Sequence, residues 1–225
     1  MRDESGSPYL ALLRDRVDLE HIPFTDRGSR LLVSWRPNGL AVRLAERWFK
    51  AHGSLSGYRE RPAILDGWTF TDHRGRQLAA RRTTWPHRVD LETRRGLFSM
   101  VFVDPETILV ALPPGRNGLE LRVRAMRGQV DRRGGVLATD DVVRRRICYT
   151  TNARVRDGRI EPADDGGQRV HLAWDAAPGD GLLLTITPRL GLNRHVPPAE
   201  AVLAASAARW LAWFAAVPPV DGLFR

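Results

Sequence analysis

The stretch Leu119-Glu120-Leu121-Arg122-Val123-Arg124 decides the fold class, because apolar and charged residues alternate throughout it. A period of two places the apolar side chains on one face of a β-strand and the charged ones on the other. The same alternation recurs in residues 170–174 (Val, Leu and Trp) and residues 182–186 (Leu, Leu and Ile). We therefore expect strands that have one face on a core and one face in water.

Turn signals separate these strands at short intervals. Asp66-Gly67, Asp157-Gly158 and Pro178-Gly179-Asp180-Gly181 are typical of hairpin or loop connections, and Pro113-Pro114-Gly115 breaks the chain between two strong strands. About a dozen strands fit between residues 31 and 187, with no helical pattern among them, and that is more than one sheet usually carries. The sequence predicts a mainly β fold, a large antiparallel β-sandwich of two packed sheets.

Helical patterns occur only at the two ends of the chain. Residues 9–17 have the spacing of a short N-terminal helix, and residues 198–217 predict a longer one that begins at Pro198. The longer helix carries two adjacent stripes: Leu203, Ala207, Trp210, Phe214 and Val217 form the first, and Val202, Ser206, Arg209 and Trp213 form the second. The helix either closes the sandwich or turns one stripe towards another domain. We expect a sandwich domain over residues 1–196 and a linker helix over residues 197–225.

The composition excludes several classes of protein. The formal net charge is +9, but the basic residues are arginines scattered along the chain, apart from Lys50, and no nucleic-acid-binding motif accompanies them. Nucleic acid is therefore not the expected partner. The sequence has no apolar run of membrane-spanning length and no signal peptide at its N-terminus. A single cysteine, Cys148, fits a reducing compartment, so we expect a cytoplasmic protein.

The search for catalytic residues finds none. The six histidines are dispersed without metal-ligand spacing, and the sequence has neither a phosphate-binding glycine loop nor a Gly-x-Ser-x-Gly turn. Cys148 lies in a predicted strand and is expected to be buried. Asp140-Asp141 and Asp164-Asp165 lie in turn-like surroundings, where solvated loop carboxylates are usual. We expect no catalytic residue, no metal and no cofactor.

The loop over residues 22–30 is the candidate binding segment. Asp26, Arg27 and Arg30 concentrate charge beside Gly28, and such groups can hold sugar hydroxyls or acids by charge-assisted hydrogen bonds. The alternative is an internal ion-pair network that fixes the loop against the sandwich. Trp35 offers a flat face on which a sugar ring could stack, as do Trp68, Trp85 and Trp174, although most of these side chains are expected in the core.

This loop and the C-terminal helix together resemble a known arrangement. Residues 22–32, the strands after them, the segment Ala208-Arg209-Trp210-Leu211-Ala212-Trp213-Phe214 and Pro218 are similar to the N-terminal domain of bacterial glycogen-debranching-enzyme-like glycoside hydrolases, the amylo-alpha-1,6-glucosidase and trehalase-like group. In that group a large β-sandwich leads through an aromatic linker helix into an (α/α)6 barrel. The resemblance implies that the general acid and base lie in the barrel, to which no segment of these 225 residues corresponds.

Three functions follow as hypotheses. The resemblance implies a non-catalytic sandwich domain that packs on the catalytic barrel through Trp210, Trp213 and Phe214, shapes its entrance and serves an oligo- or polysaccharide substrate. The second hypothesis is an autonomous carbohydrate-binding module, which a solvent-facing row of tryptophans would favour. The third is a basic scaffold that binds proteins or nucleic acid. An exposed second stripe on the helix would favour the first hypothesis, because exposed apolar patches mark interfaces.

Overall fold

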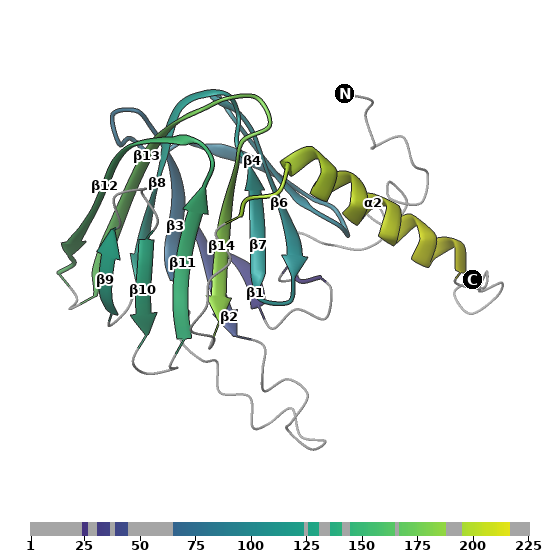
Figure 1. Cartoon of the computed structure of the whole chain (residues 1–225), viewed down its shortest axis with the longest axis horizontal. Coiled ribbons are helices and arrows are strands. Elements are labelled where there is room, and N and C mark those ends of the chain that lie inside the picture. The colour runs from purple at the N-terminus through teal and green to yellow at the C-terminus, as the bar shows by residue number, and fades with distance from the viewer. Residues whose placement is uncertain are drawn as a thin grey trace, which may run out of the picture.

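The structure is a computed structural model that describes residues 24–26, 31–36, 39–44, 65–123, 126–130, 136–140, 145–164, 167–187 and 195–216. Within these ranges the chain forms two antiparallel sheets and one helix, α2, over Ala199–Ala216 (Figure 1). The prediction of a mainly β sandwich with a C-terminal helix is confirmed. The short helix predicted for residues 9–17 lies outside the described residues, as do Arg27 and Arg30.

The two sheets have six and eight strands. The six-stranded sheet has, in spatial order, β1 (Leu31–Arg36), β2 (Gly39–Leu44), β3 (Leu65–Asp72), β8 (Gly115–Val123), β13 (Gln168–Ala176) and β12 (Arg154–Pro162). The eight-stranded sheet has β4 (Ala80–Thr84), β5 (Val89–Thr93), β6 (Gly96–Asp104), β7 (Thr107–Ala111), β14 (Gly181–Thr187), β11 (Arg145–Thr151), β10 (Val136–Asp140) and β9 (Met126–Val130).

The main core lies between the two sheets and is rich in aromatic residues. Trp68, Trp174, Phe98, Phe102 and Tyr149 are all almost completely buried there. Each buried side chain of this size contributes roughly 1.5–3 kcal/mol through the hydrophobic effect. The alternating residues of β13 and β14 face this core as the sequence predicts, but the expected water-facing side is wrong for β14, whose other face is buried as well.

Two of the predicted turns are wrong. Asp66-Gly67 lies inside β3, and Asp157-Gly158 lies inside β12. In both strands the register against the partner shifts at this point, between Asp66 and Thr69 and between Val155 and Asp157. Gly67 has a φ of 76°, which both turns and bulges require, and the ladder with β8 continues past it, so it is a bulge. The Asp-Gly pairs therefore mark irregular strands, whereas residues 177–180 do form the turn between β13 and β14.

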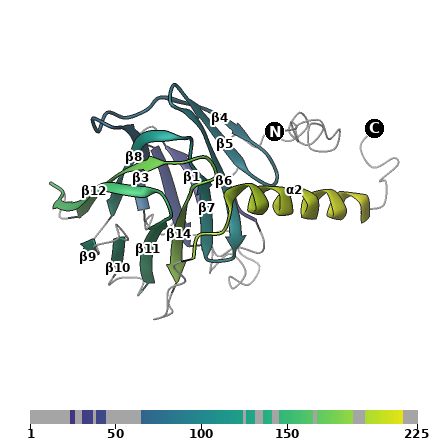
Figure 2. The same ribbon diagram turned by 45° about the horizontal axis from the view of Figure 1, so that its top comes forward.

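The eight-stranded sheet is covered on both faces where α2 crosses it. Val101, Leu109 and Leu183 point away from the main core and form a second cluster with Val196 and Ala199, against which Val202 and Leu203 pack. This explains why β6, β7 and β14 contain unbroken apolar runs, since a strand buried on both faces has no water-facing side. The first half of α2 lies on the sheet, and the second half extends beyond the sandwich (Figures 1 and 2).

Within the described ranges, no helix combines the length and the apolar character that crossing a bilayer requires.

Candidate functional site

Asp26 fastens helix α2 to the sandwich. Its carboxylate is only 6% exposed and accepts hydrogen bonds from the Arg209 guanidinium, from Trp210 Nε1 at 3.2 Å and from Ser206 Oγ at 3.5 Å. The Arg209 contact is also an ion pair. We call these four residues the Asp26 anchor. It is an internal ion pair of the kind considered for the loop, but it joins the loop to the helix, and Asp26 as a sugar ligand stays a prediction.

The segment that carries Asp26 is itself fixed to the sheet. Phe24 and Val33 of β1 exchange two backbone hydrogen bonds, at 2.8 and 2.9 Å. The Phe24 ring is buried and lies 5.3 Å from the ring of Phe102 in the main core. Because Phe24 is fixed by both a sheet pairing and an aromatic core contact, Asp26, two residues later, is held close to the sandwich and can serve as a fixed partner for the helix.

The turn between β4 and β5 also contacts the middle of helix α2. The Ser206 hydroxyl also lies 3.3 Å from the backbone carbonyl of His87, so its single proton is shared between this carbonyl and Asp26. The turn is held by Asp90, whose carboxylate accepts from Trp85 Nε1 at 3.0 Å and from Ser99 Oγ at 2.7 Å. A fully buried Ser206 therefore touches both the Asp26 loop and this turn, and the middle of α2 is tied at two points.

His87 is an unusual residue in this turn. Its ring is 1% exposed, and neither ring nitrogen has a hydrogen-bond partner among the described residues. Burial, together with the positive charges of Arg88 and Arg209, lowers the pKa of His87 from 6.5 to about 4. His87 is therefore neutral at pH 7. It lies next to helix α2, and it would become positively charged if the pH fell towards 4.

The C-terminal end of α2 carries an aromatic cluster that begins at Trp210 of the anchor. The ring of Trp210 lies 5.7 Å from the rings of both Trp213 and Phe214, and Trp213 and Phe214 are 4.9 Å apart. Trp213 is 55% exposed, and among the described residues only Leu97 is another exposed large hydrophobic side chain. We call Trp210, Trp213 and Phe214 the aromatic end of α2. A clustered apolar surface of this kind is a candidate interface.

The second stripe of the helix does not face outwards as a whole. Val202 packs on the second cluster, Ser206 is buried and Arg209 binds Asp26, so only Trp213 of that stripe is exposed. Burial on α2 changes along the helix and not between its two stripes. The sequence carried one signal for this contact: the polar residues Ser206 and Arg209 lie three residues apart in an otherwise apolar stripe. Such a pair indicates a buried polar group that faces this side of the helix, and that group is Asp26.

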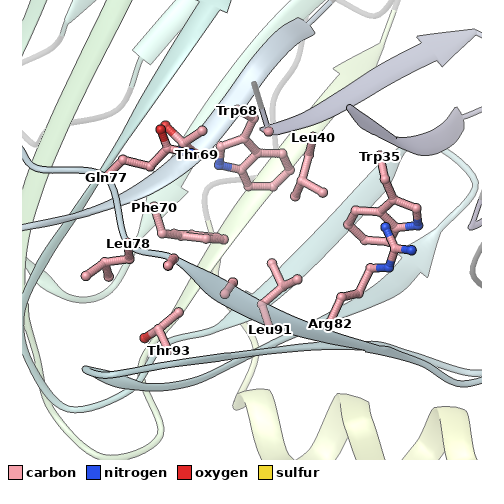
Figure 3. A pocket seen from close by; sticks show the side chains of 13 residues that line it. Trp35, Leu40, Trp68, Thr69, Phe70, Gln77, Leu78, Arg82, Leu91 and Thr93 are labelled. Carbon is pink, nitrogen blue, oxygen red and sulfur yellow. The ribbon is translucent and has the colours of Figure 1, made fainter. Parts of the chain in front are cut away.

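Trp35 lies in a separate place, a hollow at the open edge of the sandwich (Figure 3). The hollow has a volume of about 210 Å³ and is lined by residues of β1, β2 and β3 on one side and of β4 and β5 on the other. Trp35 is half-buried, and the Arg82 guanidinium lies over its ring at 4.3 Å. Asp26 does not line this hollow, so the structure does not bring Asp26 and Trp35 into one site.

The other tryptophans considered for sugar stacking are in the core, as expected. Trp68, Trp85 and Trp174 are 1%, 7% and 1% exposed. Trp68 reaches the wall of the hollow, and in the part of the chain that the structure describes its Nε1 has no hydrogen-bond partner (Figure 3). The described residues thus contain no solvent-facing row of tryptophans.

The described residues contain no group of three or more histidine, cysteine, aspartate or glutamate side chains that could hold a metal ion. Cys148 is buried, as predicted. The strongly perturbed carboxylates are structural: burial alone would raise the pKa of Asp72, but hydrogen bonds from the backbone amides of Arg76 and Arg74 and from the Arg76 side chain hold it well below its usual value.

Comparison with known proteins finds similarity to solved structures only. No protein-family model matches the sequence, and no curated protein matches it. Among solved structures, a family GH92 inverting mannosidase from Bacteroides thetaiotaomicron is similar at 11% sequence identity, with a TM-score of 0.48. The match covers 67% of this chain and 27% of the mannosidase chain. A similarity of this size carries no information about substrate or activity.

Proposed function

We propose that the chain is a non-catalytic β-sandwich domain of a cytoplasmic glycoside hydrolase that acts on α-glucans or related glycosides. In this proposal the aromatic end of α2 packs against an (α/α)6 catalytic domain, and the sandwich shapes the entrance of that domain. Support comes from the resemblance of residues 22–32 and of the helix to glycogen-debranching-enzyme-like hydrolases, and from the β-sandwich itself. Hydrolysis by two carboxylates would belong to the partner domain.

The aromatic end of α2 is the observation that carries this proposal. The exposed ring of Trp213 would gain burial in an interface, and it lies one helix turn after Arg209, which the Asp26 anchor holds in place. Trp and Phe side chains are typical of the energetic centre of an interface. A helix that is fixed at one half and apolar at the other half is suited to present a docking surface at a set angle.

The first test is genomic and enzymatic. The reading frame around this sequence, or a neighbouring gene, should encode a helical domain with paired acidic residues; its absence from the genome would overturn the proposal. In the complete enzyme, Trp213→Ala should separate the thermal unfolding of the two domains and lower maltooligosaccharide hydrolysis. The matched control is Leu97→Ala, which removes the other exposed large hydrophobic side chain and should leave both properties unchanged.

The hollow beside Trp35 favours a second candidate, an autonomous carbohydrate-binding module. Its aromatic wall and its polar side chains, among them Arg82 and Thr93, are the combination that sugar sites use. Calorimetric titration of the chain with maltoheptaose separates the two candidates. Binding that Trp35→Ala abolishes, without a change in thermal stability, would favour the module, and absence of binding would leave the docking domain.

A further inference from the structure

Arginines that are far apart in the sequence gather at one end of the sandwich. They come from the β3–β4 turn (Arg76), the β5–β6 turn (Arg94 and Arg95), the start of β8 (Arg116) and the start of β12 (Arg154 and Arg156). This is the upper end of the sandwich in Figure 1, where β7 and β11 end and β6 and β14 begin. We call it the arginine end.

The charge at this end is not balanced by the local acids. The carboxylates there are Asp72, Asp175 and Asp180, whereas across the other side chains that the structure describes, acids outnumber arginines. The guanidinium-bearing side chains of Arg76, Arg94, Arg116 and Arg156 are between 42% and 66% exposed. The positive charge of the described surface is therefore concentrated at one end of the molecule.

Hydrogen bonds and ion pairs hold the guanidinium groups in two clusters that meet at the adjacent residues Arg94 and Arg95, and we call the two clusters together the row. Arg95 Nη2 lies 3.3 Å from His73 Nδ1 and donates to the Arg116 carbonyl at 3.0 Å. Arg116 Nε is 3.4 Å from Asp175 Oδ1, and Arg156 pairs with the same carboxylate. At the other end of the row, Asp72 Oδ2 accepts from Arg94 and from Arg76, each at 2.9 Å.

These contacts orient the arginines without using all their donors. A guanidinium has five N–H groups, and the contacts described here use only one or two of them. Buried Asp72 and half-buried Asp175 hold the side chains in fixed positions, so less conformational entropy is lost when a ligand binds. The row crosses from the eight-stranded sheet to the six-stranded sheet.

We propose that the arginine end binds a linear acidic polysaccharide, with the carboxylates of its uronic acid residues paired to successive guanidinium groups. Planar guanidinium and carboxylate groups match each other in bidentate geometry. An extended row of fixed cations suits a chain with repeated anionic groups better than it suits one small anion. The choice of a glycan as the ligand rests on the proposed function. The charge and the extended shape of the row are features of the structure and do not depend on that proposal.

Two other polyanionic partners fit the described residues less well. Proteins that bind single-stranded nucleic acid stack bases on rows of exposed aromatic rings, and among the described residues no Trp, Tyr or Phe side chain is exposed at the arginine end, where the exposed ring is that of His73. An interface with an acidic protein would need an apolar centre, and Leu97 is the one large exposed hydrophobic residue beside this row. A carbohydrate chain, rich in hydroxyls and carboxylates, needs neither feature.

The test is binding of the chain to sodium polygalacturonate, measured by affinity electrophoresis and calorimetry at 50 and 200 mM NaCl. We expect binding that weakens with salt, and an increase in Kd of at least about tenfold for Arg95→Glu/Arg116→Glu, because two attractive charges become repulsive. The matched control, Arg159→Glu/Arg169→Glu, reverses two comparably exposed arginines on the six-stranded sheet and should change Kd less than about twofold. Arg95→Gln/Arg116→Gln replaces the charge-reversed variant if that variant does not fold.

Several results would overturn this inference. They are no binding of polygalacturonate, an equal loss in both pairs of variants, or tighter binding of single-stranded or duplex DNA at the same concentration of charge. Failure here is distinguishable from failure of the proposed function, since the latter is tested on neutral maltooligosaccharides with variants of Trp213. A chain that ignores polygalacturonate while its complete enzyme depends on Trp213 would reject only the acidic polysaccharide.

Discussion

Replacement of Asp26 by alanine should destabilise the fold through loss of the contact between the loop and helix α2. The carboxylate is almost fully buried and accepts three hydrogen bonds, one of them from a guanidinium. A hydrogen bond to a charged group contributes about 1.5–3 kcal/mol, and the long 3.5 Å contact with Ser206 adds little. Because the Arg209 side chain is 38% exposed and can turn towards water, we expect a total loss of about 3 kcal/mol.

The assay is urea unfolding followed by far-UV circular dichroism and by tryptophan fluorescence, because Trp210 reports on the anchor directly. A loss of about 3 kcal/mol corresponds to a decrease in Tm of roughly 6–12 °C for a chain of this size. Asp26→Asn keeps an acceptor for Trp210 Nε1 but removes the charge, so it should cost roughly half as much. In a double-mutant cycle, Asp26→Ala and Arg209→Ala should show a coupling energy of about 1.5–3 kcal/mol.

One combination of results would refute this reasoning. If Asp26→Ala unfolds at the same urea concentration as the wild type and loses affinity for a maltooligosaccharide, Asp26 is a ligand-binding residue and not an anchor. A coupling energy near zero with Arg209 would likewise show that the ion pair contributes nothing to stability. Lower stability with unchanged sugar affinity is the expected outcome.

Three further predictions follow from other parts of the structure. The folded-state pKa of His87, about 4, is below its unfolded value of 6.5, so the unfolded chain takes up the proton first. The stability contributed by neutral His87 should be complete above pH 6.5 and fall by up to about 3 kcal/mol as the pH drops towards 4; His87→Gln should flatten this part of a pH series of urea unfolding curves. Gly118→Ala should destabilise the six-stranded sheet by about 1–3 kcal/mol, because a Cβ there would lie 2.5 Å from the Leu172 carbonyl oxygen, and an unchanged Tm would contradict this. The purified chain alone should not hydrolyse maltooligosaccharides, trehalose or isomaltose, and turnover that persists through rigorous purification would disprove this.

The sheets could be predicted from the sequence, but their irregularities could not. Period-two alternation depends on each strand alone, which is why β13 and β14 were correctly expected to face the core. Asp-Gly pairs predict turns only when the chain reverses there, and in β3 and β12 the neighbouring strands continue the ladder past them. Those neighbours are distant in sequence, so local residues cannot reveal whether a glycine makes a turn or a bulge.

The candidate sites depend still more on distant contacts. Asp26 and Arg209 are 183 residues apart, and no local pattern joins them. Charge shows the same limitation: arginines that look scattered in the sequence come from turns and strand starts that the two sheets bring to one end. Composition alone did not favour nucleic acid as a partner, whereas the arrangement of the same residues in space is the basis of the proposed site for an acidic polysaccharide.

If α2 links the sandwich to a partner domain, as proposed, the Asp26 anchor determines how rigid that link is. Ser206 and Arg209 lie one turn of helix before Trp210 and Trp213, so the direction of the aromatic end is set by the loop and by the β4–β5 turn. A flexible tether would lose conformational entropy on docking, but a helix that is already fixed loses little. A partner that packs on Trp213 would therefore bind at an angle that the sandwich dictates. Loosening the anchor, by Asp26→Ala or by protonation of His87, should weaken that docking even though neither residue touches the partner.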